Sequence, residues 1–117
     1  MNIVADILVG LVAALHLYFL VLEMFLWTTP TGRRTFGLEA GFAEQSKSLA
    51  ANQGLYNGFL VAGLVWGLAA DRTDVKVFFL ACVIVAGLYG AATVSKRILL
   101  VQAVPAVLAL GAVLLSR

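Results

Sequence analysis

Long apolar runs alternate with short polar connections along this chain. The runs cover about residues 3–27, 49–70, 76–95 and 98–116. Each run has roughly the 17–25 residues that a helix needs to cross a bilayer. They are unbroken rather than alternating, which favours helices, and open sheets cannot span lipid. The pattern therefore predicts an all-α integral membrane protein whose residues 1–117 form a single transmembrane domain of four spanning helices.

The connections between the runs predict how the helices follow one another. Residues 28–48 begin with a turn composition around Pro30, and residues 39–48 are expected to extend the second helix beyond the membrane. Residues 71–74 and 95–97 form tight connections. Short connections make successive helices antiparallel neighbours. We therefore predict an up-down-up-down four-helix bundle.

Three local features add detail to this bundle. Asp74 is expected to cap the third helix, because a short acidic side chain can accept from the free amides there. Pro105 removes a backbone donor and is expected to kink the fourth helix. The N-terminus lacks the positive region of a secretory signal, so we interpret the first run as a retained span.

Composition supports the lipid bilayer as the partner of this chain. Its residues are 62% hydrophobic and 12% charged, whereas soluble domains are roughly 45–50% apolar and about 25% charged. The eight Lys/Arg and six Asp/Glu form no basic tract, which excludes nucleic-acid binding. The single Cys82 cannot form an internal disulfide, and no Cys/His cluster has the spacing of a metal site.

Flanking charge predicts the orientation of the bundle. Cytoplasmic loops carry an excess of Lys and Arg. Five such residues lie on the side of the first and third connections and three on the other side: Arg33, Arg34, Lys47, Lys96 and Arg97 against Arg72, Lys76 and Arg117. We therefore expect a multi-pass protein of the cell inner (plasma) membrane, with loops 28–48 and 95–97 cytoplasmic and both termini outside.

Several polar residues interrupt the first two runs at related depths. In antiparallel helices, facing residues have numbers with a nearly constant sum, and Glu23 with Asn52 gives 75 while His16 with Asn57 gives 73. His16 and Glu23 share a helix face at a spacing of seven, and Gln53 shares one with Asn57 at a spacing of four. Polar groups in hydrocarbon are costly and mark functional sites. The pattern predicts a polar layer in the cytoplasmic half of the bundle.

The last two runs contribute to the same layer. Tyr89 lies on one stripe of the third run, and Gln102 lies about one turn into the fourth. Arg33 and Arg34 are expected at the mouth of the pocket, where their planar guanidinium groups suit an anionic ligand. Two alternatives stay open: the polar residues bond helices to one another, with His16 a core residue, and the arginines only determine topology.

Two segments of this chain resemble a known family. His16, the run LEMFLWTTP from residue 22, Gly32-Arg33 and the run ANQGLYNGF from residue 51 resemble the small bacterial membrane proteins of domain of unknown function 1304. The resemblance covers essentially the whole chain. It implies four transmembrane helices and brings no established activity.

Two weaker resemblances concern single positions. Glu44, Lys47 and Asn52 partly match the second-helix pattern of the membrane-associated eicosanoid and glutathione metabolism family, but Gln45 and Ser48 stand where that family has Arg. This departure counts against glutathione binding. The small multidrug-resistance transporters share the chain length and a Glu in the first span.

These observations predict an amphiphilic or lipophilic small-molecule ligand in a pocket open to the cytoplasm. Glu23 and His16 are the candidate catalytic or ligand-binding groups, and the amides orient the ligand. The alternatives are a small proton-coupled transporter, a membrane-embedded transferase and a structural accessory subunit. Glycines 54/58 and 63/67 have the GxxxG spacing of close helix contacts, and we expect a homo-oligomer.

Overall fold

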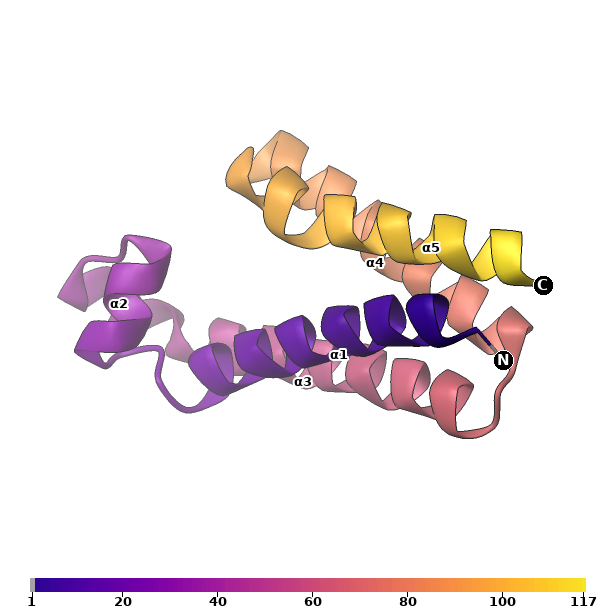
Figure 1. Ribbon diagram of the computed structural model, residues 1–117. Coiled ribbons are helices and arrows are strands. Elements are labelled where there is room, and N and C mark those ends of the chain that lie inside the picture. Colours follow the sequence, from indigo (N-terminus) through magenta and orange to yellow (C-terminus); the bar gives the residue numbers. More distant parts are fainter. Residues whose placement is uncertain (1) are drawn as a thin grey trace. The chain divides into compact units, whose positions relative to one another are not determined.

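The protein is all-α in the part of the chain that the structure describes. The structure is a computed structural model, and it describes residues 2–117. Within that range it has five α-helices, one π-helical turn and no strand (Figure 1). The elements are α1 Ile3–Met24, α2 Pro30–Phe36, α3 Ala40–Ala69, α4 Thr73–Thr93, η1 Leu99–Ala103 and α5 Val104–Ser116. The sequence-based prediction of an all-α chain is confirmed.

Three of the four predicted spans are helices of membrane-crossing length and apolarity. They are α1, α4 and the continuous stretch of η1 and α5, Leu99–Ser116. The run at 49–70 does form a helix, as part of α3, which begins at Ala40 as the helix-compatible pattern predicted. It is not among the three apolar spans, because the amides Asn52, Gln53 and Asn57 lower its hydropathy.

The chain divides into two compact units. The first contains the described residues up to Ala14 together with residues 60–117, and the second contains residues 15–59. Helices α1 and α3 each run without a break through both units. The first unit has a core of small and branched side chains from four helices: Ala5, Val9, Val12, Ala13, Leu64, Leu80, Val83, Ala106, Ala109 and Val113. Their spacing of three or four residues along α1 and α5 places them on one stripe of each helix.

The glycines at GxxxG spacing make contacts inside the chain. A Cβ on Gly54 or Gly58 would meet Met24 or Leu20, and one on Gly63 or Gly67 would meet Phe79 or Lys76. Glycine is therefore needed at these positions for close approach within each unit. These contacts within the chain already occupy the glycines, so the GxxxG spacing no longer supports a homo-oligomer. The homo-oligomer stays a prediction.

The predicted turn after the first span is in fact a short helix. Thr29 caps α2 and accepts a hydrogen bond from the Gly32 amide at 3.3 Å, and Pro30 occupies the start of the helix, where its missing N–H costs nothing. Gly37 ends the helix with a left-handed φ of 66°, a conformation that glycine adopts readily. The first connection is therefore an ordered element.

The predicted cap of α4 is wrong. The capping position is Arg72, which makes no side-chain cap, and Asp74 lies in the first turn. The Asp74 carboxylate accepts from the Val75 backbone amide and also accepts two hydrogen bonds from the Arg72 guanidinium, at 3.2 and 2.6 Å. These bonds raise the pKa of Arg72 above its ordinary value. A two-pronged bond to a guanidinium is stronger than a single amide bond. The pair with Arg72 is therefore the main interaction of the Asp74 carboxylate.

The last helix carries a wide turn just before Pro105. Residues 99–103 form the π-helical η1, and Pro105 falls at the start of α5. A π-turn hydrogen-bonds over five residues instead of four and is a recognised cause of bending. The kink expected at Pro105 stays a prediction, and the wide turn is the feature found beside it.

The contact between α4 and η1 leads to a first prediction. A Cβ on Gly87 would lie 3.0 Å from the Ala103 amide nitrogen, whereas a Cβ on Gly111 would meet nothing within 4 Å. We expect Gly87→Ala to lower the free energy of unfolding by about 1–3 kcal/mol, because backbone must move. Gly111→Ala should raise it by up to about 1 kcal/mol. Thermal unfolding in detergent measures both, and equal effects would contradict the close contact.

Candidate functional site

Glu23 and Asn57 form the central polar pair of the second unit. The Asn57 amide Nδ2 donates a hydrogen bond to Glu23 Oε1 at 2.5 Å. Asn57 is only 4% exposed, and Glu23 is half-buried. An amide bound to one carboxylate oxygen fixes the side chain and leaves the other oxygen for a second donor. The pair is therefore a fixed acceptor at the end of α1.

The structure pairs the first two runs in a different register from the one predicted. Gly54 lies against Met24 and Gly58 against Leu20, so facing residues have numbers that sum to 78. The predicted partners, Glu23 with Asn52 and His16 with Asn57, had sums of 75 and 73. The shift arises because the glycines let the helices meet closely at these points. Asn57 consequently bonds to Glu23.

Glu23 also lies nearer a helix end than the sequence suggested. Helix α1 stops at Met24, not at residue 27, so Glu23 is in its last turn. In the register set by Met24 and Gly54, the amides of Asn52 and Gln53 lie beyond the end of α1. Both side chains are exposed, and neither bonds to Glu23. His16 is fully buried, with its ring edge-on to Phe19 at 5.5 Å.

A pocket of about 270 Å³ opens beside the Glu23 carboxylate. Binding sites for complete small molecules are typically about 300–1,000 Å³, so this one suits a small ligand or one end of a longer one. Its wall combines apolar and polar side chains from the end of α1, the following loop and α3: Glu23, Met24, Phe25, Trp27, Thr28, Lys47, Ser48 and Ala51. The lining is amphipathic.

Trp27 is the most firmly held part of this wall. Its indole Nε1 donates to Ser46 Oγ at 3.0 Å, and its ring packs on Phe36 at 4.9 Å between centroids. The Ser46 hydroxyl donates in turn to the Phe42 carbonyl at 2.6 Å. On the same side of α3, Lys47 pairs with Glu44 at 2.6 Å. The indole therefore has a defined position before any ligand arrives.

The two arginines do not line the Glu23 pocket. They lie in a separate and open pocket of about 410 Å³, together with Pro30, Gly37 and Leu38. The two pockets share no lining residue. Arg34 is exposed, and Arg33 is half-buried. The expectation that both arginines lie at the mouth of the Glu23 pocket stays a prediction, which their position in a separate pocket does not support.

Tyr89 and Gln102 belong to the first unit and line neither of these two pockets. Tyr89 is 71% exposed, and its carbonyl accepts from the Thr93 hydroxyl at 2.7 Å. Gln102 is half-buried in η1. Residues 2–117 contain no group of three or more His, Cys, Asp or Glu side chains placed to hold a metal ion.

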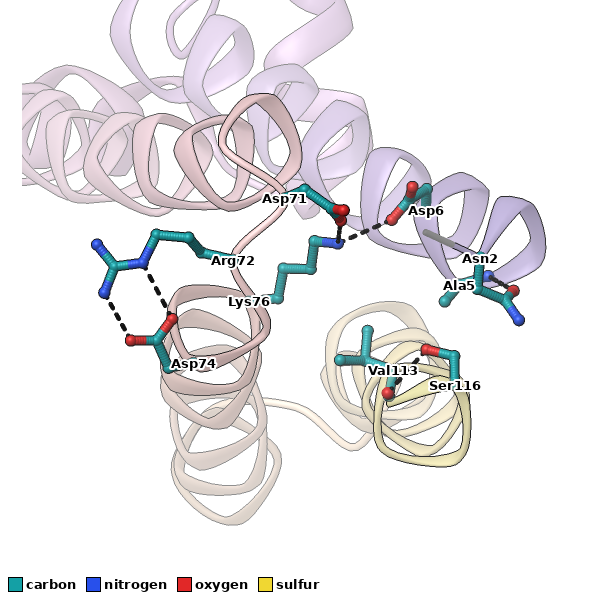
Figure 2. A network of polar contacts seen from close by, with 9 residues as sticks. All are labelled: Asn2, Ala5, Asp6, Asp71, Arg72, Asp74, Lys76, Val113 and Ser116. Atoms are coloured by element: carbon teal, nitrogen blue, oxygen red, sulfur yellow. Dashed lines mark hydrogen bonds and ion pairs between the residues drawn. The ribbon is translucent and has the colours of Figure 1, made fainter.

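A charged cluster in the first unit escaped the sequence analysis. The Lys76 ammonium lies 3.0 Å from Asp6 Oδ1 and 3.2 Å from Asp71 Oδ1 (Figure 2). Lys76 is only 5% exposed, and Asp71 has a left-handed φ of 50° in the turn between α3 and α4. The sequence treated Lys76 as a flanking charge. The signal in the sequence was that Asp6 lies about one turn inside the first apolar run and Lys76 lies at the start of the third.

Comparison with known proteins places the chain among relatives of the same length. Residues 10–114 match the family described as "Protein of unknown function (DUF1304)". "Uncharacterized protein YpaA" of Lactococcus lactis subsp. lactis (strain IL1403) is 34% identical over 114 residues, which cover 94% of this chain and 96% of that relative. No solved structure matches the chain. The resemblance carried by His16 and the two quoted segments is confirmed.

The Glu23–Asn57 bond predicts energetic coupling. A hydrogen bond contributes about 0.5–1.5 kcal/mol net, so a double-mutant cycle of Glu23→Ala and Asn57→Ala should give a coupling energy of at least that size in detergent unfolding. A control cycle of Glu39→Ala and Asn57→Ala should give no coupling energy, because Glu39 is an exposed residue before α3. Additive effects of Glu23→Ala and Asn57→Ala would show that the pair does not bond.

The Lys76 cluster predicts a large loss of stability on removal of its cation. Lys76→Met leaves two carboxylates without their shared partner, and we expect about 3 kcal/mol of destabilisation. Lys47→Met breaks an exposed pair and should cost less than about 1 kcal/mol. Unfolding of both variants in the same detergent provides the test. A Lys76→Met variant as stable as Lys47→Met would mean that the cluster is not formed.

Proposed function

This chain belongs to the family of proteins of unknown function DUF1304, and we propose that it is a multi-pass membrane protein that binds an amphiphilic or lipophilic small molecule beside Glu23. One observation carries the proposal. A carboxylate fixed by a buried amide faces a pocket whose other wall is Met24, Phe25 and Trp27. Such a wall can bind a polar head group and an apolar body together.

The membrane part of the proposal depends on the apolar helices. Three helices have the length and composition of spans, and in the proposal the apolar half of α3 is the fourth, so that the bundle runs up-down-up-down. The contacts of Gly54 and Gly58 with α1 support this. The excess of Lys and Arg beside the first and third connections supports a cytoplasmic position for the Glu23 pocket.

The lining of the pocket indicates the chemistry of the ligand. Glu23 accepts hydrogen bonds, so the head group of the ligand carries a hydroxyl, amide or amine donor. Thr28 and Ser48 offer hydroxyl groups beside it, and the apolar part of the ligand packs on the indole of Trp27. His16 lines neither of the two pockets described above, so Glu23 is the residue on which binding depends in this proposal.

Trp27 gives a direct measure of binding. The chain has two tryptophans, so Trp66→Phe leaves Trp27 as the one indole reporter. In phosphatidylcholine nanodiscs, a brominated long-chain alcohol should quench Trp27 fluorescence in a saturable way. Adding Glu23→Gln should weaken the apparent affinity by up to about tenfold, because one acceptor oxygen of the carboxyl group is replaced by an amide donor.

Glu39→Gln is the matched control, because it removes the same charge at an exposed position before α3. It should leave the quenching curve unchanged. Quenching that rises linearly with probe, or that is equal in the Glu23→Gln and Glu39→Gln proteins, would mean that the alcohol only partitions into lipid. The binding proposal would then be wrong. Substrate flux across sealed vesicles would instead favour the transporter alternative.

A further inference from the structure

We propose that Arg33 and Arg34 form a binding site for a phosphate group, separate from the Glu23 pocket. Two sources carry that chemistry: the head group of a phospholipid and a soluble phosphate ester. The proposal concerns residues 30–38 alone. It stands whether or not the Glu23 pocket binds a ligand, because the two pockets share no residue.

No acidic side chain lines the pocket that contains the two arginines. Their pocket of about 410 Å³ is completed by Pro30, Gly37 and Leu38. Two neighbouring guanidinium groups without a carboxylate in the same pocket produce a local excess of positive charge. Such an excess attracts an anion.

Three cations of the chain are neutralised by carboxylates, whereas no ion pair is found for Arg33 among the described residues. Lys47, Arg72 and Lys76 each pair with at least one carboxylate. Arg33 Nε is buried and has no hydrogen-bond partner among the described residues. A buried N–H without an acceptor is unfavourable, and a bound phosphate oxygen would satisfy it.

Helix α2 is well suited to hold the two side chains in place. A Cβ on Gly32 would overlap the Leu26 carbonyl, so α2 lies directly on the preceding backbone. Phe36 packs on Trp27 at the other end. The amides of Gly37 and Leu38 already donate to the Arg33 carbonyl. The guanidinium groups are therefore the donors that this pocket offers.

Phosphate fits this donor set better than a carboxylate does. Each guanidinium presents a planar fork of N–H groups that can bind two oxygens at once. A phosphate has enough oxygens for both forks, whereas a carboxylate is filled by one. An indole such as that of Trp27, which packs on Phe36 of α2, is typical of the level of lipid head groups.

The test compares two basic pairs of equal charge. Arg33→Gln/Arg34→Gln and Lys96→Gln/Arg97→Gln each remove two positive charges, the second pair from an exposed connection. The first arm titrates inorganic phosphate and glycerol phosphate into the protein in phosphatidylcholine nanodiscs. The second arm measures retention of phosphatidylglycerol by native mass spectrometry. In whichever arm the wild-type protein binds its probe, we expect Arg33→Gln/Arg34→Gln to lower the affinity at least about tenfold. Lys96→Gln/Arg97→Gln should lower it by less than about twofold.

The arms also identify the source. Binding in the first arm alone assigns a soluble phosphate ester, and binding in the second alone assigns a phospholipid. Arg33→Lys/Arg34→Lys keeps the charge without the forks and should lose part of the affinity. Equal losses in the two Gln pairs, no binding in either arm, or equal binding of succinate would overturn the proposal.

Two measurements guard against misfolding. Thermal unfolding should show that the double Gln variant keeps the wild-type midpoint. If it does not, Arg34→Gln alone provides the test, because Arg34 is exposed, and it should lose at least about threefold in affinity. Phosphate binding that survives in the Glu23→Gln protein confirms that this site is independent of the other pocket, and its loss there would overturn that independence.

Discussion

The cost of placing polar groups away from water is the constraint on which this structure depends. Helices satisfy it for the backbone, because each amide bonds within its own segment. The side chains satisfy it in pairs: Asn57 bonds to Glu23, and Lys76 lies between Asp6 and Asp71. The Glu23–Asn57 and Lys76–Asp6 contacts each join segments that are far apart in the sequence. These polar pairs therefore stabilise the contacts between the segments that they join.

Close backbone approach decides how well those pairs align. Gly54 and Gly58 allow α3 to lie against Met24 and Leu20 of α1, and Asn57, which lies between these glycines, bonds to Glu23. In the register predicted from the sequence, Asn57 would have faced His16 instead. A shift of a few residues thus changes the partner of the one half-buried carboxylate in the second unit. The position of the candidate pocket follows from glycine contacts.

Sequence reasoning succeeded where one physical signal dominated. The apolar runs predicted helices, and the pattern after Glu39 predicted the long extension of α3. It failed where two signals competed. The turn composition at Pro30 also fits a capped helix, and Asp74 lies in the first turn of α4 rather than at its capping position, paired with the Arg72 guanidinium. Of the candidate residues, Glu23 and Asn57 meet as a bonded pair. The exact helix ends and side-chain partners depend on tertiary contacts, which residue spacing alone does not predict.

The wide turn at residues 99–103 has a consequence for changes of chain length. A π-turn contains one residue more per hydrogen-bonded ring than an α-turn, so it absorbs an extra residue without rotating the helix on either side. Deleting one residue there would convert the turn to ordinary α-helix and keep Ala106 and Ala109 in the core. The same deletion within α5 would turn the following side chains by about 100° around the axis. Among relatives of this chain, length differences in the last helix should therefore fall at this turn.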